Sequence, residues 1–263
     1  MSEYEQICYP HTYINQVIIR LDFLNYCPSE VLFTEDFEKE IKKYFPRKNK
    51  DQLLRFNSFN VMFDPNNNGM PNANGTTIEG LQKEYSTADG KNKLFLSNKF
   101  IALEVNAYVS FEEHLKCLRS CILSLFSGRR ITVARTGIRY INIYDQEKIK
   151  LQKSFFSDDI AASLVVKKTI QDAEYPYLIR SMHTSEYRSD SLVLNFRYGM
   201  FNPEYPNIMT KNSFVLDYDC FSEEIIETSD LVIETITQGH SLIQSLFEKN
   251  ITDSMRKVMK NGL

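Results

Sequence analysis

The 263-residue sequence predicts an α+β fold, in which amphipathic helices pack on one side of one or more antiparallel sheets. Runs of β-branched and aromatic residues alternate with turn dipeptides such as Asp89-Gly90, which is typical of antiparallel meanders. Other segments show the apolar spacing of helices behind an N-cap residue. Three apolar strands with acidic residues near their ends are each followed by such a helix, namely IIRLDF, IALEVNAYV and FVLDYDCF.

The elements expected before residue 80 follow from these patterns. A β-branched run predicts a strand over residues 13–23. Thr34 is the expected N-cap of a helix that ends before Pro46, with an apolar face of Phe37, Ile41, Tyr44 and Phe45. Residues 53–63 predict a second strand. Residues 64–77 are rich in Asn, Gly and Pro, which indicates a mobile surface loop.

The strongest helical pattern covers residues 111–126. Ser110 and Glu113 form a capping box, in which each side chain bonds to a free backbone N–H at the start of the helix. Behind this box runs an apolar stripe of Phe111, Leu115, Leu118, Ile122, Leu125 and Phe126. Ser127-Gly128 ends the helix, and the strand that contains TGIRYIN, residues 136–142, follows.

Beyond residue 145 the pattern is more mixed. A short helix and a connection are expected within residues 146–172, and an antiparallel pair is expected at 177–187 and 192–200. The last strand is expected at 214–221. Ser222 is the expected cap of a long helix that reaches at least Phe247, with an apolar stripe of Ile225, Val232, Ile236, Ile243 and Phe247.

The length of the chain allows one large core. We expect a single compact domain over residues 1–263. Two intimate halves, 1–145 and 146–263, each with a ferredoxin-like arrangement, are the alternative.

Composition excludes several classes of protein. A net charge of −3 argues against a surface built wholly for nucleic acid. The apolar runs fall well short of the roughly 20 residues of a membrane helix, so no membrane partner is expected. The N-terminus lacks the apolar segment of a signal peptide, and five cysteines without framework spacing indicate reduced thiols. We therefore expect a cytoplasmic protein.

The strand RTGIRYIN, the opening YPHTYINQVIIRLDF and the closing FVLDYDCF…LIQSLFEKNITDSM together resemble a sporadically distributed, uncharacterised bacterial protein family. The family's R-x-G-x-R-Y-x-N strand motif is matched at Arg135, Gly137, Arg139, Tyr140 and Asn142. Its C-terminal pattern is matched at Asp217, Asp219, Phe247, Ile251 and Thr252. The resemblance supplies no catalytic residues. Its patchy distribution implies mobile genes, such as those of defence islands or toxin–antitoxin pairs.

The binding candidates are Arg135, Arg139, Tyr140 and Asn142. In an unbroken strand the two arginines share one face, about 13 Å apart, and the other two residues share the opposite face. A bulge at Gly137 would instead place Arg135 beside Tyr140 and Asn142. Anion binding by these arginines is possible chemistry, but no glycine-rich phosphate loop lies nearby. We therefore favour structural ion pairs with the acids Asp22, Glu104, Asp217 or Asp219.

Two sets of potential metal ligands are weighed against structural roles. Asp217 and Asp219 share a strand face, and such carboxylates hold magnesium in nucleases. Neither lysine nor histidine is close in sequence, so pairing with arginine is favoured. His114, Cys117 and Cys121 lie on one side of a helix, but a closed zinc site needs four ligands. We predict no metal site and no cofactor.

Six cations lie close together in sequence, and four of them are the candidates for nucleic-acid contact: Lys42, Lys43, Arg47 and Lys48. Lys50 and Arg55 complete the group, and Tyr44, Phe45 and Phe56 could stack on bases. Phe45, however, belongs to the apolar face of its helix.

The expected function is therefore a non-enzymatic interaction component of a bacterial gene pair, with a protein encoded nearby as its partner. A nucleic-acid-binding component that uses residues 42–56 is the alternative, and a metal-dependent nuclease is the third possibility. The order rests on the absence of a metal set, a nucleotide loop or a nucleophile motif from the sequence.

Overall fold

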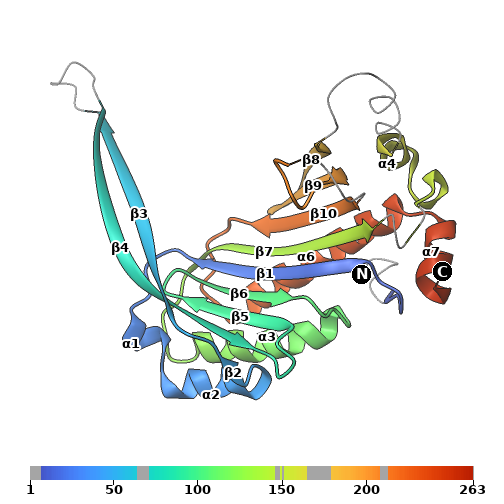
Figure 1. The fold of residues 1–263 in the computed structure, drawn as a ribbon. Helices are drawn as coiled ribbons and strands as arrows, with labels where there is room; N and C mark the ends of the chain where they lie inside the picture. Colours follow the sequence, from blue (N-terminus) through green and yellow to red (C-terminus); the bar gives the residue numbers. More distant parts are fainter. Residues whose placement is uncertain are drawn as a thin grey trace.

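The computed structural model describes residues 7–63, 71–145, 149, 151–164, 179–207 and 213–262, with the backbone alone at 56–63 and 71–78 (Figure 1). The strands are β1 (Ile14–Phe23), β2 (Arg47–Lys48), β3 (Gln52–Phe63), β4 (Pro71–Ser86), β5 (Asn92–Ser97), β6 (Phe100–Val105), β7 (Val133–Asp145), β8 (Ser181–Ser189), β9 (Leu192–Phe201) and β10 (Ser213–Ser222). The helices are α1 (Ser29–Leu32), α2 (Glu35–Tyr44), α3 (Phe111–Phe126), α4 (Asp158–Ser163), α6 (Ser229–Asn250) and α7 (Asp253–Asn261), and Lys153–Phe155 is a 3₁₀ turn.

The ten strands of the described chain form one sheet in the order β2-β4-β5-β6-β1-β7-β10-β9-β8, and β3 pairs with β4. Every pairing is antiparallel. The helices α3 and α6 run along one side of this sheet (Figure 1), where α6 contacts β7 and β10 and α2 contacts α3. The predicted α+β class is thus confirmed, with an antiparallel sheet and helices on one side.

Two sets of β-α-β-β-α elements meet at β7. The first runs through β1, α2, β5, β6 and α3 and ends on β7, so that its strands lie in the order β5-β6-β1-β7. The second starts from β7 and continues through α4, β9, β10 and α6, with strand order β9-β10-β7-β1. Because β7 is the last strand of one set and the first of the other, both sets share the centre of the sheet.

The two faces of the sheet differ in burial. In β1, Val17, Ile19 and Leu21 point toward the helices and are at most 2% exposed. Arg20 and Asp22 alternate with them and are partly exposed on the other face. This follows from the two-residue period of a strand. We call the second face, which lies away from the helices, the open face.

Most predicted elements are present, and two predictions are wrong. The loop predicted over 64–77 is wrong at residues 71–77, because β4 already begins at Pro71 and pairs with β3 from Pro71 to Gln82. Residues 64–70 lie outside the described residues. The polar sequence of residues 71–77 lacks the apolar pattern from which a strand is predicted. A strand can form there all the same, because a ladder of backbone hydrogen bonds needs no apolar side chains.

The long helix begins later than predicted. Ser222 is the last residue of β10, and the helix cap is Thr228, whose hydroxyl accepts from the Leu231 N–H. Between them the chain stays extended, because Ile226 forms a bridge with Val133. Ile225 therefore lies outside the helix and is 63% exposed, contrary to its predicted place in the apolar stripe.

The other helix starts agree with their capping signals. The Thr34 hydroxyl accepts from the Phe37 N–H, and the Ser110 hydroxyl accepts from the Glu113 N–H. None of the described helices is both long enough and apolar enough to cross a membrane.

Candidate functional site

Strand β7 contributes residues to both faces of the sheet, and this divides the four binding candidates into two pairs. The register between β7 and β1 runs without a shift from Arg135 to Tyr140, so Gly137 is not a bulge. Arg135 and Arg139 therefore lie on the open face. Tyr140 and Asn142 point toward the helices, where they are 5% and 3% exposed.

Arg139 is held by a carboxylate on the neighbouring strand β10. Its Nε and Nη2 donate to the two oxygens of Asp217 at 2.7 and 2.8 Å. Arg197, from β9, lies 2.7 Å from the same carboxylate, which is itself buried. Asp217 raises the pKa of Arg139 through its hydrogen bonds. The predicted pairing of Arg139 with a strand acid is confirmed, and about a third of its side chain remains exposed.

Arg135 is bound far more loosely. Its guanidinium lies 4.3 Å above the centre of the Phe221 ring, and it is 3.9 Å from Asp22 and 3.8 Å from Asp219. These separations exceed hydrogen-bond length, so the carboxylates act through charge alone. Gly137 leaves space for this arrangement, because a Cβ there would come within 3.1 Å of Arg135 Nη1.

These arginines line a groove of about 400 Å³ on the open face. Its walls combine charge with apolar surface from β1, β5 and β6. The main lining residues are Ile18, Arg20, Phe95, Phe100, Glu104, Arg135, Arg139 and Asp219. Arg20 is tied to Asp22 by two hydrogen bonds and lies 4.1 Å above the Phe100 ring. We call this surface the charged groove.

The acids of the charged groove are shifted toward protonation. Burial raises the pKa of Glu104, and the positive charge of Lys93 offsets part of this rise. Burial also raises the pKa of Asp219, against the opposing effect of Arg135 and Arg139. Within the described chain, Glu104 has neither a hydrogen bond nor an ion pair. The groove thus holds charged groups that the fold itself leaves incompletely paired.

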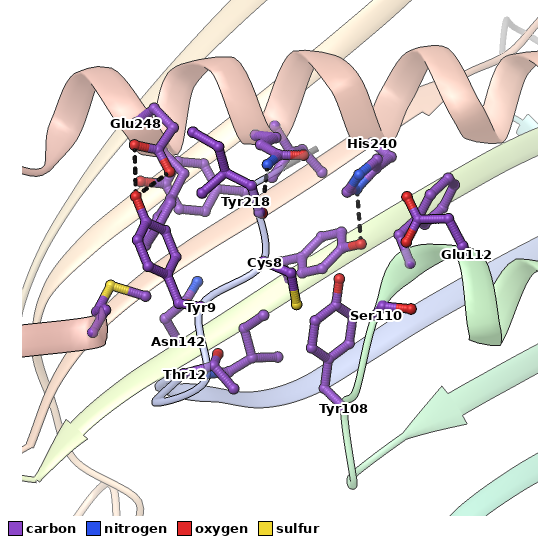
Figure 2. Close-up of a pocket in the computed structure, with 18 residues that line it drawn as sticks. Cys8, Tyr9, Thr12, Tyr108, Ser110, Glu112, Asn142, Tyr218, His240 and Glu248 are labelled. Atoms are coloured by element: carbon purple, nitrogen blue, oxygen red, sulfur yellow. Dashed lines mark hydrogen bonds between the residues drawn. The ribbon is translucent and has the colours of Figure 1, made fainter. Parts of the chain in front are cut away.

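Tyr140 and Asn142 lie on the other side of β7, against a cavity between the sheet and α6 (Figure 2). The Tyr140 hydroxyl is 2.9 Å from His240 Nδ1. Asn142 donates to the backbone oxygen of Leu216 at 3.3 Å. Tyr140 thus packs against helix α6, and Asn142 satisfies a backbone group of the neighbouring strand.

The residues weighed as metal ligands are engaged elsewhere. Asp217 accepts from two guanidinium groups, which occupy the oxygens that a magnesium ion would need. Within the described part of the chain no group of three or more His, Cys, Asp or Glu could hold a metal ion. His114 accepts the Val109 N–H. Burial raises the pKa of Cys117 to about 11 and that of Cys121 to about 12, which keeps both as thiols.

The basic segment at 42–56 is largely neutralised by its own neighbours. Lys42 pairs with Glu38, Lys43 with Glu40, and Lys48 with Asp51. Two of the three rings expected to stack are also engaged, and the side chain of the third, Phe56, lies outside the described residues. Phe45 is 1% exposed. The Tyr44 hydroxyl bonds to Ser120. Arg47 lies on the short edge strand β2.

Several residues in the charged groove or beside it escape prediction from sequence. Arg197 reaches Asp217 from β9, and Phe95 and Phe100 reach the groove from β5 and β6. Their alternation along a strand marks them as facing one side, but the sequence does not say which strands become neighbours. The strand order is the missing information.

Compared with known proteins, the chain matches no protein-family model and no curated protein. What the protein does must therefore be inferred from its own geometry.

Proposed function

We propose that this protein is a non-enzymatic interaction component of a bacterial gene pair, and that it binds a partner protein through the charged groove. The observation that carries the proposal is the state of Arg135. Its side chain is 30% exposed, and among the described residues its guanidinium has ion-pair neighbours at 3.8 and 3.9 Å but no hydrogen bond. Its donors are therefore available to an acceptor from outside the chain.

The chemistry of the groove defines the partner surface that would fit. A planar guanidinium matches a carboxylate through two parallel hydrogen bonds. Phe95 and Phe100 flank the arginines with apolar surface. We therefore infer a partner that places an Asp or Glu over Arg135 and apolar side chains beside these rings. Arginine and aromatic residues at the centre of a patch are typical of binding hot spots.

The arm formed by β3 and β4 supports a role in recognition. Only Gln82–Ser86 of β4 pairs with β5, whereas the preceding residues 71–81 pair with β3 alone. An isolated two-stranded ribbon is marginally stable in water. Leu53, near the base of β3, is 78% exposed. Figure 1 shows the arm extending away from the sheet, which is a form suited to contact with another molecule.

The two other functions have weaker support. Nucleic-acid binding would need free cations at residues 42–56, and three of those cations are paired with acids. A magnesium-dependent nuclease would need Asp217, which two arginines already occupy. The family resemblance, through its patchy distribution, favours a gene pair such as a defence or toxin–antitoxin system.

Co-expression with the product of the adjacent reading frame tests the proposal. We expect the tagged protein to co-purify with that product, and Arg135→Ala to abolish co-purification. Arg130→Ala is the matched control, because Arg130 is exposed and lies five residues earlier on the chain, outside the groove. Failure of the wild-type pair to co-purify would overturn the proposal. Retention of binding by Arg135→Ala would show that the partner does not bind through Arg135 of the charged groove.

A further inference from the structure

A second hollow lies behind β7, on the side of the helices. It is a cavity of about 100 Å³ between β7, α6, the start of α3 and the N-terminal segment (Figure 2). The N-terminal segment is held in place as one wall. Gln244 donates to the Ile7 carbonyl at 2.9 Å, and the His11 N–H donates to the Met259 carbonyl at 3.0 Å.

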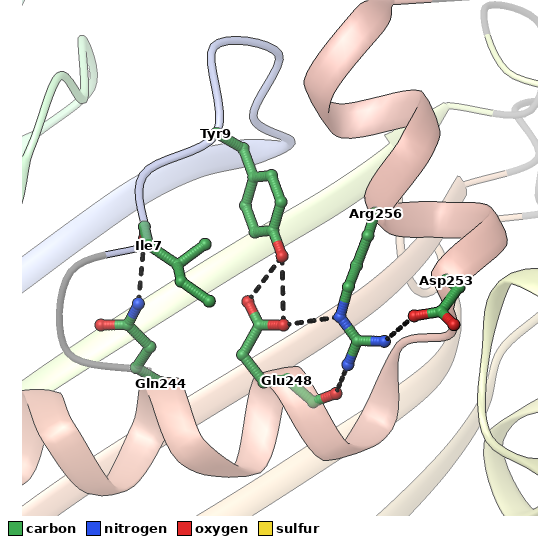
Figure 3. Close-up of polar contacts among 6 residues, drawn as sticks. All are labelled: Ile7, Tyr9, Gln244, Glu248, Asp253 and Arg256. Atoms are coloured by element: carbon green, nitrogen blue, oxygen red, sulfur yellow. Dashed lines mark hydrogen bonds and ion pairs between the residues drawn. The ribbon is translucent and has the colours of Figure 1, made fainter. Parts of the chain in front are cut away.

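Helix α6 contributes a buried acid whose charge is already balanced. Glu248 is 1% exposed, and both of its carboxylate oxygens accept from the Tyr9 hydroxyl. Arg256 donates to it at 2.9 Å and also pairs with Asp253 (Figure 3). Glu248 therefore anchors the N-terminal segment, and its negative charge is balanced by Arg256 of α7.

The interior of the cavity is aromatic. Tyr108 and Tyr140 meet edge to face with ring centres 5.8 Å apart. Phe111 stacks on His240 at 3.8 Å, and Phe247 and Tyr218 close the far side. Burial raises the pKa of Tyr108 to about 12, so its phenol stays neutral. The cavity is thus lined largely by aromatic rings.

The charge around this space has one sign. No Lys or Arg is found among the described residues that line it. Glu112, in the first turn of α3, is exposed and lines the cavity (Figure 2). Glu248 is balanced by Arg256, so Glu112 is the carboxylate whose charge the cavity experiences.

We propose that this cavity binds a small organic cation of about the size of tetramethylammonium. Aromatic rings attract a cation through their quadrupoles, and a carboxylate at the mouth adds Coulomb attraction. An apolar site of roughly 150 Å³ holds benzene. This cavity, at about 100 Å³, is a third smaller, so it suits a ligand of no more than about five heavy atoms.

An anion of the same size fits less well. The start of α3 could favour an anion through its free N–H groups. The Ser110 hydroxyl, however, already accepts from the Glu113 N–H. An entering anion would also meet Glu112 with no cation to offset the repulsion.

Three ligands of different charge, with five, five and seven heavy atoms, test the proposal. Titration calorimetry with tetramethylammonium, tert-butanol and pivalate measures binding of a cation, a neutral molecule and an anion. We expect tetramethylammonium to bind at millimolar concentration, and each of the other two to bind at least roughly tenfold more weakly. Equal binding of tert-butanol, preference for pivalate, or no binding by any of the three would each overturn the proposal.

Variants locate the site. Glu112→Gln should weaken tetramethylammonium binding roughly threefold to tenfold. Its control is Glu113→Gln, which removes the same charge from the next residue, outside the cavity lining. Tyr108→Leu should abolish binding and Tyr108→Phe should retain it, because the ring supplies the attraction. Circular dichroism establishes that each variant is folded. Equal effects of Glu112→Gln and Glu113→Gln, or retained binding in folded Tyr108→Leu, would contradict the assignment.

Discussion

Arg135 and Arg139 are the same residue type on the same face of one strand, yet their surroundings give them different roles. Arg139 donates two hydrogen bonds to the carboxylate of Asp217. Arg135 lies between two carboxylates, at ion-pair distance from both but without a hydrogen bond to either. The first residue therefore belongs to the structure of the sheet, and the second is available for recognition.

Replacing Arg139 should reduce stability, because Asp217 would keep Arg197 but lose its bidentate partner. Breaking a fully buried pair costs about 3–5 kcal/mol. Here the arginine is 32% exposed, so solvent weakens the pair. We expect Arg139→Ala to lower the free energy of unfolding by about 2 kcal/mol, and Arg139→Met by about half of that, since Met keeps the packing.

Urea denaturation measures both variants, with Arg188→Ala on the exposed part of β8 as a control expected to be nearly neutral. An increase in stability on removal of Arg139 would show that the two groove arginines repel each other, as in a ligand clamp.

Glu104 should make stability depend on pH. Because burial raises its pKa, the folded state binds the proton more readily than the unfolded state. Stability from this group is therefore greatest below its ordinary value of 4.5 and falls as pH rises through the shifted pKa. We expect Glu104→Gln to raise the melting temperature at pH 7, with the difference vanishing below that ordinary value. Equal or lower stability of the variant at pH 7 would contradict this account.

At the scale of elements, sequence patterns located those whose signals are local. The caps at Thr34 and Ser110 and the apolar stripe of α3 were sufficient to place two helices. The start of α6 was misplaced because Ser222 carries a capping residue type, whereas the strand bridge of Ile226 to Val133 decides the conformation there. That bridge joins residues far apart in sequence, so no local pattern contains it.

Helix α6 packs against β7 at Gly239, which faces Ile138. A Cβ at this position would lie 2.9 Å from Ile138 Cγ2. Overpacking costs about 1–3 kcal/mol, and replacing Gly by Ala in a helix recovers up to about 1 kcal/mol. We expect Gly239→Ala to lower the free energy of unfolding by about 1 kcal/mol. Gln238→Ala, one residue earlier and exposed, should be neutral or slightly stabilising. Thermal melts that show Gly239→Ala to be the more stable variant would refute close packing there.

At the scale of the whole molecule, the two β-α-β-β-α sets share β7 and one hydrophobic core. The buried core cluster extends from Leu94 on β5 to Leu194 on β9. The sequence could predict strands and helices on each side, but the sharing of β7 depends on the strand order. For the same reason, the charged groove assembles residues from strands that the chain order does not make neighbours.

The shared strand predicts cooperative unfolding. Neither set can lose β7 without exposing the core of the other, so we expect a single transition. Differential scanning calorimetry should give a calorimetric enthalpy equal to the van't Hoff enthalpy. Two resolved transitions would indicate halves that fold separately.

The central claim is that the open face binds a partner through Arg135. Footprinting with phenylglyoxal, read by mass spectrometry, measures the reactivity of each arginine in the free protein and in its complex with the adjacent gene's product. We predict that the partner protects Arg135 and leaves the exposed Arg130 and Arg188 reactive. Unchanged reactivity of Arg135 in a complex that forms would contradict the claim.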